Sequence, residues 1–149
     1  MHYRVSVVID QPRDRVAQLL QDPDALPHWQ KGFVSITPQQ GEPGAPGSTA
    51  MLAYQMGKRE LSMLETMEST DWPAGWIATY EADGVWNRQV NRLIEQAGQT
   101  RWESDCEFRF SSLPMRCMGW LMPWAFRKQT RSYLLDFKRY AETGEAVRP

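Results

Sequence analysis

The chain has 149 residues, enough for one domain with a sizeable core, and its acidic and basic side chains nearly cancel to a net charge of −1. Because charges of both signs are interspersed, we expect no nucleic-acid partner, which would need a concentrated basic face. The longest apolar-rich run, 113–126, contains Arg116 and is shorter than the roughly 20 residues that cross a bilayer, so stable membrane insertion is not expected. The N-terminus has no signal-peptide pattern, and Cys106 and Cys117 have neither redox nor metal spacing. These features predict free thiols in the reducing cytoplasm.

The first third of the chain reads as a strand, two short helices and a loop. Residues 2–9 alternate apolar and polar side chains, which predicts a half-buried strand. One helix should begin near Pro12, since proline is tolerated in the first turn, and a second short helix should lie within 22–30. A short strand is expected over 33–37. Residues 38–48 hold three glycines and three prolines and are expected to form a loop.

The central third reads as successive antiparallel strands joined by tight turns. Asp83-Gly84 is a strong hairpin signal, because both central positions of a type I′ turn need positive φ. In the last of these segments every outward position is charged, which indicates a sheet with one wet face and one covered face. The expected strands are 49–56, 59–68, 76–81, 86–95 and 101–110.

The last third, 113–142, is expected to be helical, with Pro123 kinking the helix or dividing it in two. One apolar stripe, which runs from Phe126 to Tyr140 and includes Phe137, should lie on the sheet. A second stripe lies on the opposite side of the first half. It consists of Cys117, Trp120, Leu121 and Trp124.

Three explanations of this second stripe stay open. The helix could be kinked inward, so that the stripe faces protein and a cavity. The stripe could be the centre of a homodimer interface, or it could touch a membrane during ligand exchange.

Two stretches that lie at opposite ends of the chain resemble a known superfamily. These are VVIDQPRDRVAQLLQDPDALPHW and LMPWAFRKQTRSYLLDFKRYAE. They are similar to the START-like (SRPBCC) helix-grip superfamily, and most of all to its polyketide cyclase/dehydrase-like branch. The resemblance covers nearly the whole chain and implies that residues 1–149 form one START-like ligand-binding domain. The implied fold is α+β: a curved antiparallel sheet of about seven strands wrapped around a long C-terminal helix, with two short helices after the first strand.

The resemblance also implies a cavity between the sheet and the last helix, which in relatives holds lipids, sterols, polyketides or other apolar molecules. Members include carriers, sensors, cyclases and hydrolases, with no shared catalytic motif to transfer, and a fold does not fix a function. We therefore expect a protein that binds a small hydrophobic or amphipathic molecule without a cofactor. The alternative is a cyclase or dehydrase acting on an aromatic substrate, and a third possibility is a cavity filled by the protein's own tryptophans.

Glu65 is the most notable polar candidate because it is in phase with Met63 and Met67. A carboxylate in an apolar pocket needs a raised pKa or a cationic partner, which Arg88 or Arg92 could supply. Alternatively Glu65 faces water. The pattern of 86–95 does not decide which of its two faces is wet, so its amide side chains could also point inward. The predicted ligand-binding residues are Trp29, Tyr54, Met63, Glu65, Tyr80, Arg88, Asn91, Trp102, Met118, Met122 and Phe126.

Catalytic and metal motifs are sparse. With only His2 and His28, a histidine metal site is not available, and no GxSxG nucleophile motif occurs. His28 is best explained as a partly exposed loop residue. Ligand exchange would be gated by the 38–48 loop and by the kink at Pro123.

Overall fold

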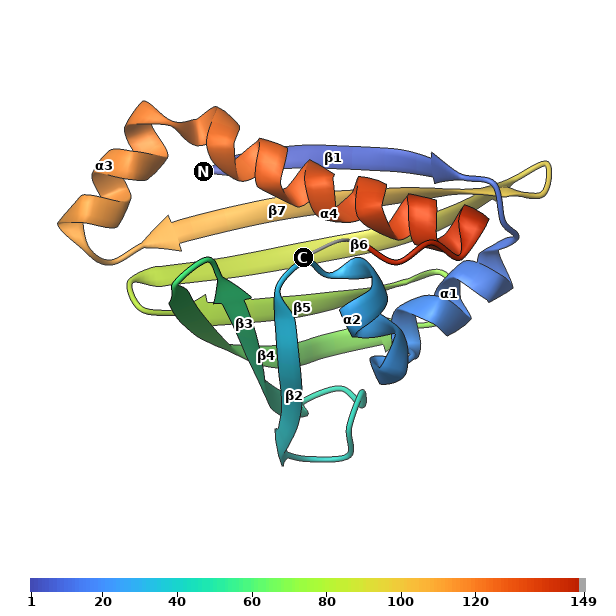
Figure 1. Cartoon of the computed structure of the whole chain (residues 1–149), viewed down its shortest axis with the longest axis horizontal. Helices are drawn as coiled ribbons and strands as arrows, with labels where there is room; N and C mark the ends of the chain where they lie inside the picture. Colours follow the sequence, from blue (N-terminus) through green and yellow to red (C-terminus); the bar gives the residue numbers. More distant parts are fainter. Residues whose placement is uncertain (148–149) are drawn as a thin grey trace.

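The computed structural model describes residues 1–147, in which seven strands form one antiparallel sheet of order β1-β7-β6-β5-β4-β3-β2. The first strand therefore pairs with the last, and the others follow one another through hairpin connections (Figure 1). The strands are β1 (His2–Ile9), β2 (Phe33–Gln40), β3 (Thr49–Met56), β4 (Arg59–Asp71), β5 (Gly75–Ala82), β6 (Val85–Gln96) and β7 (Gln99–Phe110).

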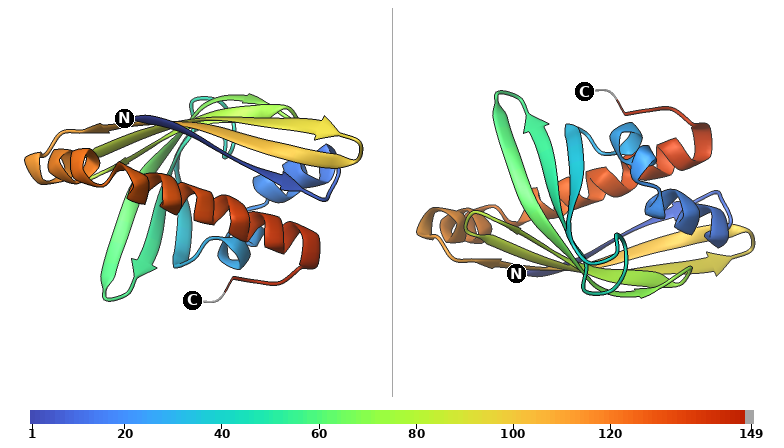
Figure 2. Two further views of the ribbon diagram at one scale, coloured as in Figure 1. Left: turned by 90° about the horizontal axis from the view of Figure 1, so that it is seen from above. Right: turned by 90° about the horizontal axis from the view of Figure 1, so that it is seen from below.

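The helices lie at two points in the chain, after the first strand and after the last. The first group is α1 (Arg13–Gln21), the short 3₁₀ helix η1 (Pro23–Ala25) and α2 (Leu26–Trp29), and the second is α3 (Leu113–Leu121) and α4 (Pro123–Thr143). The sheet is strongly bent, and β2, β3 and β4 turn away from the other strands so that the sheet curves around the side on which α4 lies (Figure 2). This confirms the predicted helix-grip α+β fold.

An aromatic cluster fills the interior between α2, α4 and the sheet. The ring of Phe137, which is fully buried, lies 5.1 Å from that of Trp29 and 5.4 Å from that of Trp102, both in edge-to-face contact. Such pairs contribute about 0.5–1.5 kcal/mol beyond the area that they bury. Leu134 and Leu93 pack into the same cluster. At this end of the molecule, tryptophans form a solid core.

The register of β6 and β7 decides which side chains face inward. Leu93 lies opposite Trp102, and both are buried in the core. Because successive strand residues alternate between faces, Asn91 points to the same inner face, together with Asn87 and Gln89. The sequence did not decide which face of residues 86–95 points inward. In the structure it is the face of β6 that carries the amide side chains.

Two strands extend well beyond their predicted ends. β2 continues to Gln40 and β4 to Asp71, so the loop is shorter than predicted and covers 41–48. Gly47 N–H donates to Met67 O at 2.6 Å, which fastens the end of this loop to β4.

Pro123 divides the C-terminal segment into two helices, as one of the two predicted outcomes. Met122 between them has φ −131° and ψ 52°, which is outside the helical region.

The second apolar stripe of the C-terminal segment points to solvent. Trp120 is 82% exposed, Leu121 64% and Trp124 60%. Of the three explanations left open, the one in which this stripe is turned inward onto a cavity is wrong, because the opposite side of α3 packs on the sheet. Gly119 is the residue of α3 that contacts the sheet. A Cβ there would lie 2.5 Å from the Phe110 ring, so only glycine lets the helix come this close to β7.

Candidate ligand-binding site

The long helix α4 covers only part of the inner face of the sheet. It packs against β1 and α2, and both figures place it alongside β1. On that side Val5, Val7 and Ser104 are buried. On the inner face of β4 and β5, Glu65 and Tyr80 keep part of their surface accessible. The described helices therefore leave the middle of the inner face only partly covered.

A row of residues crosses four strands on this part of the inner face. Ala50 of β3 lies opposite Glu65, Glu65 opposite Tyr80, and Tyr80 opposite Asn87. The row includes a carboxyl, a phenol and an amide, which are three groups that recognise oxygen or nitrogen atoms of a ligand. Glu65 and Asn87 are 22 positions apart in the sequence. The pairing of the strands brings the three groups together.

Glu65 and Tyr80 form the polar centre of this row. Burial raises the pKa of the Glu65 carboxyl, and the adjacent Tyr80 hydroxyl acts in the opposite direction. Burial also raises the pKa of the Tyr80 hydroxyl, and the negative charge of Glu65 raises it further. Within residues 1–147 none of the salt bridges includes Glu65. The pair is thus an acid and a phenol in apolar surroundings, without a neutralising cation.

Tyr54 adds a second phenol to this region. It is buried, and its hydroxyl donates to Oε1 of Gln30 at 2.7 Å. Burial raises the pKa of Tyr54, and nearby Tyr133 and Glu65 raise it further. The hydroxyl therefore stays protonated at neutral pH, while its oxygen retains a lone pair for a ligand donor.

The amides of β6 are oriented by their neighbours. Asn87 Nδ2 donates to Glu107 O at 3.0 Å, and its Oδ1 accepts from Gln89 Nε2 at 2.9 Å. Asn91 Oδ1 accepts from Trp102 Nε1 at 3.0 Å. Because an indole nitrogen can only donate, this bond fixes which end of the Asn91 amide is the oxygen. Asn91 Nδ2 is then a buried donor with no partner among the described residues.

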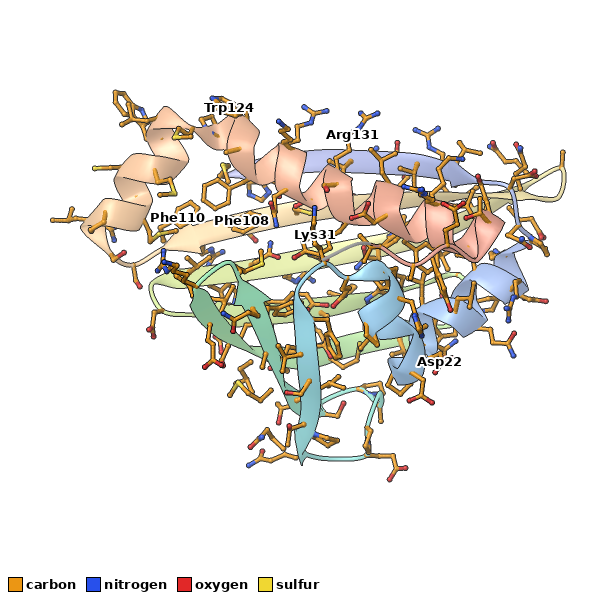
Figure 3. The ribbon with its side chains drawn as sticks, viewed as in Figure 1. Asp22, Lys31, Phe108, Phe110, Trp124 and Arg131 are labelled. Carbon is orange, nitrogen blue, oxygen red and sulfur yellow. The ribbon has the colours of Figure 1, made fainter. Side chains whose placement is uncertain are left out.

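Apolar side chains surround these polar groups. Met63 and Met67 flank Glu65 on the inner face of β4, and both are half-buried. At the other end of the inner face, Phe126 contacts Phe108 and Phe110, with ring centroids 5.2 and 5.3 Å apart. Figure 3 shows Phe108 and Phe110 between the helices and β7. Flexible methionines and aromatic rings with a few placed polar groups are typical of sites for small apolar molecules.

The residues predicted for ligand binding fall into four groups. Tyr54, Met63, Glu65, Tyr80 and Asn91 lie on the inner face described above. Trp29 and Trp102 belong to the packed core, and Phe126 belongs to the phenylalanine cluster. Met118 and Met122 are 46% and 40% exposed near the α3–α4 junction, away from the row. Gln30 and Tyr133, which the sequence analysis did not single out, lie close to the polar centre through Tyr54.

Arg88 is the exception, because it lies on the outer face of the sheet. Its guanidinium binds Glu68, with Nε 2.8 Å from Oε2 and Nη2 3.0 Å from Oε1. Arg92 is also outside and pairs with Asp105 at 2.5 Å. The predicted ion pair between Glu65 and one of these arginines is therefore wrong, since the two-residue period of β6 turns both away.

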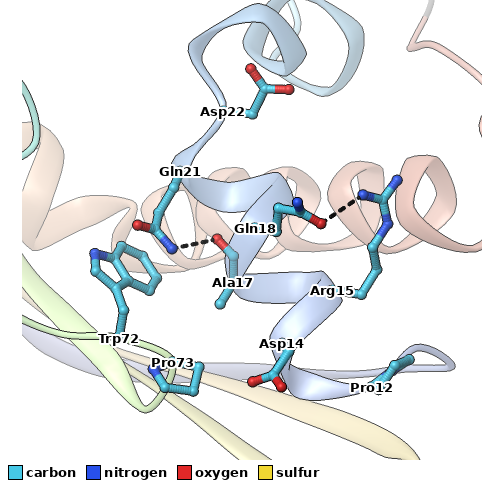
Figure 4. A pocket seen from close by; sticks show the side chains of 9 residues that line it. All are labelled: Pro12, Asp14, Arg15, Ala17, Gln18, Gln21, Asp22, Trp72 and Pro73. Carbon is cyan, nitrogen blue, oxygen red and sulfur yellow. Dashed lines mark hydrogen bonds between the residues drawn. The ribbon is translucent and has the colours of Figure 1, made fainter.

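Two hollows open at the surface outside this row. One, of about 720 Å³, lies between α1 and the β4–β5 turn, lined by residues that include Asp14, Gln18 and Trp72 (Figure 4). The other, of about 620 Å³, is bordered by Gln30, the start of β2 and the β3–β4 hairpin. Neither is lined by Glu65 or Tyr80. The second adjoins the candidate site, because it shares Gln30, which binds Tyr54.

Within residues 1–147, no three histidine, cysteine, aspartate or glutamate side chains gather closely enough to hold a metal ion. Cys106 is buried and Cys117 exposed, both as free thiols, and burial raises the pKa of Cys106. In the same part of the chain, no helix has the length and apolar character needed to cross a membrane.

Sequence comparison gives no relative. A scan of protein-family models finds no match, and a search of curated protein sequences finds none either.

Comparison with solved structures gives clear matches in fold. Ara h 8.0201 superposes with a TM-score of 0.76 at 12% sequence identity, over 95% of this chain and 97% of that one. The protein TTHA0849 from Thermus thermophilus gives 0.77 at 17% identity with the same coverage. The ZhuI aromatase/cyclase from Streptomyces sp. R1128 gives 0.71 at 15% identity over 99% of both chains. These likenesses confirm the helix-grip fold that the resemblance implied.

Proposed function

We propose that this protein binds a small, largely apolar molecule on the inner face of its sheet, beside α4. The observation that carries this proposal is the accessibility of the inner face of β4 and β5. Glu65 and Tyr80 are deep enough for burial to raise the pKa values of both, yet they keep accessible surface. Partial burial of this kind supports the proposal that both side chains border a ligand site.

The polar groups define what the ligand would carry. The Tyr80 phenol can donate to a ligand, and Asn91 Nδ2 is a buried donor without a partner among the described residues. An unsatisfied buried donor costs about 1–3 kcal/mol, and a ligand oxygen would offset that cost. We therefore infer an uncharged ligand with a carbonyl or hydroxyl oxygen on an apolar body, such as a lipid, a polyketide or another aromatic compound. Burial of that body, at roughly 25 cal/mol per Å², would supply most of the affinity.

A matched pair of substitutions on β5 tests the location of the site. Ala82 lies on the inner face and its neighbour Glu81 on the outer face. Ala82→Phe should weaken binding of the neutral fluorescent probe N-phenyl-1-naphthylamine by about tenfold or more, because the ring fills the space. Glu81→Phe adds the same ring outside and should leave binding unchanged. Equal effects of the two variants, or no uptake of the probe by the wild type, would exclude this site.

An enzymatic role is the second candidate, favoured by a carboxyl whose pKa is raised by burial and by the fold match to an aromatase/cyclase. In that role Glu65 would be the general acid and Tyr80 would orient it. Native mass spectrometry of the purified protein would identify a co-purified compound to use as a substrate. Glu65→Gln should then lower turnover by about 10²–10⁴-fold if the carboxyl transfers a proton. If the protein only binds, Glu65→Gln should keep most of the affinity.

The cellular setting is part of the same proposal. Two free thiols and the lack of a membrane-spanning helix in the described residues fit a cytoplasmic protein. A homodimer and the absence of a nucleic-acid partner stay predictions from the sequence.

A further inference from the structure

The tip of the molecule formed by α3 and the start of α4 carries an exposed apolar patch. Its members are Leu113, Trp120, Leu121 and Trp124, with 74%, 82%, 64% and 60% of their surface exposed. We call these four residues the apolar tip. Figures 1 and 2 show α3 projecting at one end of the sheet, beyond the end of β7. Contiguous exposed apolar groups of this size mark interaction sites on soluble proteins.

The apolar tip stands on a fixed support. Ser112 Oγ accepts from Met115 N–H at 3.4 Å at the start of α3, and Arg116 Nε donates to Phe110 O at 2.9 Å. Gly119 rests directly against the Phe110 ring. These contacts hold α3 with its other side on the sheet, so the tryptophans are turned outward by packing.

Charge is segregated around this tip, in contrast to the even mixture expected from the whole sequence. Residues 108–135 contain five basic residues and no aspartate or glutamate. In a chain with net charge −1, this segment of +5 leaves −6 for the remaining residues. The five are Arg109, Arg116, Arg127, Lys128 and Arg131. Arg109 pairs with Glu107 at 3.1 Å, whereas the salt bridges within residues 1–147 include none of the other four.

The basic residues of α4 share a face with Trp124. Arg127, Lys128 and Arg131 follow it at three, four and seven positions, which places all four on one side of the helix. All of them are exposed. Figure 3 shows Trp124 and Arg131 on the same side of α4, along its upper edge in that view. An apolar projection is thus continuous with a row of cations.

The combination of exposed apolar side chains and neighbouring basic residues favours one kind of partner over another. A second copy of the chain, related by a twofold axis, would bring the same cations face to face with no acid in the segment to neutralise them. An anionic bilayer satisfies both components, because indole rings and leucines settle at the headgroup boundary while arginine and lysine bind lipid phosphates. We propose that the apolar tip and the basic face of α4 dock this protein onto an anionic lipid surface. Docking of this kind is peripheral and needs no spanning helix.

Vesicle co-sedimentation with the full chain tests this proposal. Wild-type protein should bind vesicles of phosphatidylcholine with about 30% phosphatidylglycerol, with a blue shift of tryptophan emission, and bind pure phosphatidylcholine far more weakly. Binding should weaken in about 0.5 M salt, which screens the charges. Trp120→Ser with Trp124→Ser, and separately Arg127→Glu with Lys128→Glu, should each lower the affinity by about tenfold or more.

Matched controls separate the patch from general effects of charge and hydrophobicity. Arg15→Glu with Lys58→Glu makes the same change of net charge at two exposed positions elsewhere, and Val34→Ser truncates an apolar side chain that is 59% exposed. Both controls should bind as the wild type does, and circular dichroism should show that all variants are folded.

Three results would overturn the proposal. They are no affinity of the wild type for anionic vesicles, equal losses in the patch and control variants, and a dimer in light scattering that the tryptophan variant dissociates.

Discussion

Glu65 and Tyr80 lie directly opposite each other on β4 and β5, and burial raises the pKa values of both side chains. The folded protein therefore holds the proton of Glu65 more tightly than the unfolded chain does. As a result, the contribution of Glu65 to stability falls as the pH rises from about the ordinary glutamate pKa of 4.5 through the higher folded value. At pH values above the folded pKa, the buried carboxylate lowers the stability of the protein by an amount that no longer changes with pH.

This predicts how Glu65→Gln responds to pH. Since glutamine stays neutral, the variant should be more stable than the wild type at pH 7 and above, and the difference should shrink towards zero below the unfolded pKa. Urea denaturation at a series of pH values measures both free energies of unfolding.

Glu68→Gln is the control for this experiment, because the pKa of Glu68 is shifted in the opposite direction to that of Glu65. The hydrogen bond from Arg88 lowers the pKa of Glu68, so that side chain adds stability above the unfolded pKa and loses it as the pH falls through the folded value. Its variant should be no more stable than the wild type at pH 7. A parallel pH response of the two variants would contradict the burial of Glu65.

A second prediction concerns the bond between Asn91 and Trp102. Asn91→Leu removes the acceptor of a buried indole N–H and should destabilise the protein by about 1–3 kcal/mol. In the double variant Asn91→Leu with Trp102→Phe, the indole N–H is also removed, so no buried donor is left without its acceptor. The double variant should therefore be more stable than the sum of the single effects predicts, by about 0.5 kcal/mol or more. Thermal and urea unfolding of the four proteins measure this coupling, and strict additivity would mean that the bond does not form.

The sheet face of β6 shows why the sequence predicted the fold better than the site. The two-residue period of 86–95 was evident, but both faces combine polar and apolar groups. Trp86 and Val90 share the outer face with Arg88 and Arg92. In the structure Arg109 covers the Trp86 ring from outside, 4.8 Å from its centroid. Only pairing with β7, which sets Leu93 against Trp102, fixes the phase of the strand.

The same limit applies to the C-terminal segment. Its division at Pro123 was foreseeable, because proline cannot continue the hydrogen-bonding pattern of a helix. The orientation of α3 was not, because this helix is apolar on both sides. The deciding contact is between Gly119 and Phe110, and a helical pattern does not show which side meets a ring from another element. For Glu65 the sequence left both faces open, and the structure places it on the inner face together with Met63 and Met67.

A third prediction follows from the hydrogen bonds of the 41–48 loop, which was expected to gate ligand exchange. Gly47 N–H donates to Met67 O at 2.6 Å, and Met67 N–H donates to Ser48 O at 2.9 Å. Hydrogen exchange at Gly47 and Met67 should therefore be slow, whereas exposed Glu42 and Gly44 should exchange quickly. Gating would then be restricted to the outer part of the loop. Fast exchange at all four amides would instead show that the whole loop opens.

The last prediction is that Gly119→Ala disturbs the base of the apolar tip. The new Cβ would lie 2.5 Å from Phe110, so either the ring or α3 must shift, and overpacking of this kind costs about 1–3 kcal/mol. Phe110→Leu makes room, so the double variant should recover much of the stability that Gly119→Ala loses. Denaturation of the three variants and the wild type measures this recovery. If α3 instead swings freely in solution, Gly119→Ala should stabilise the helix slightly, because alanine favours helical backbone over glycine by about 1 kcal/mol.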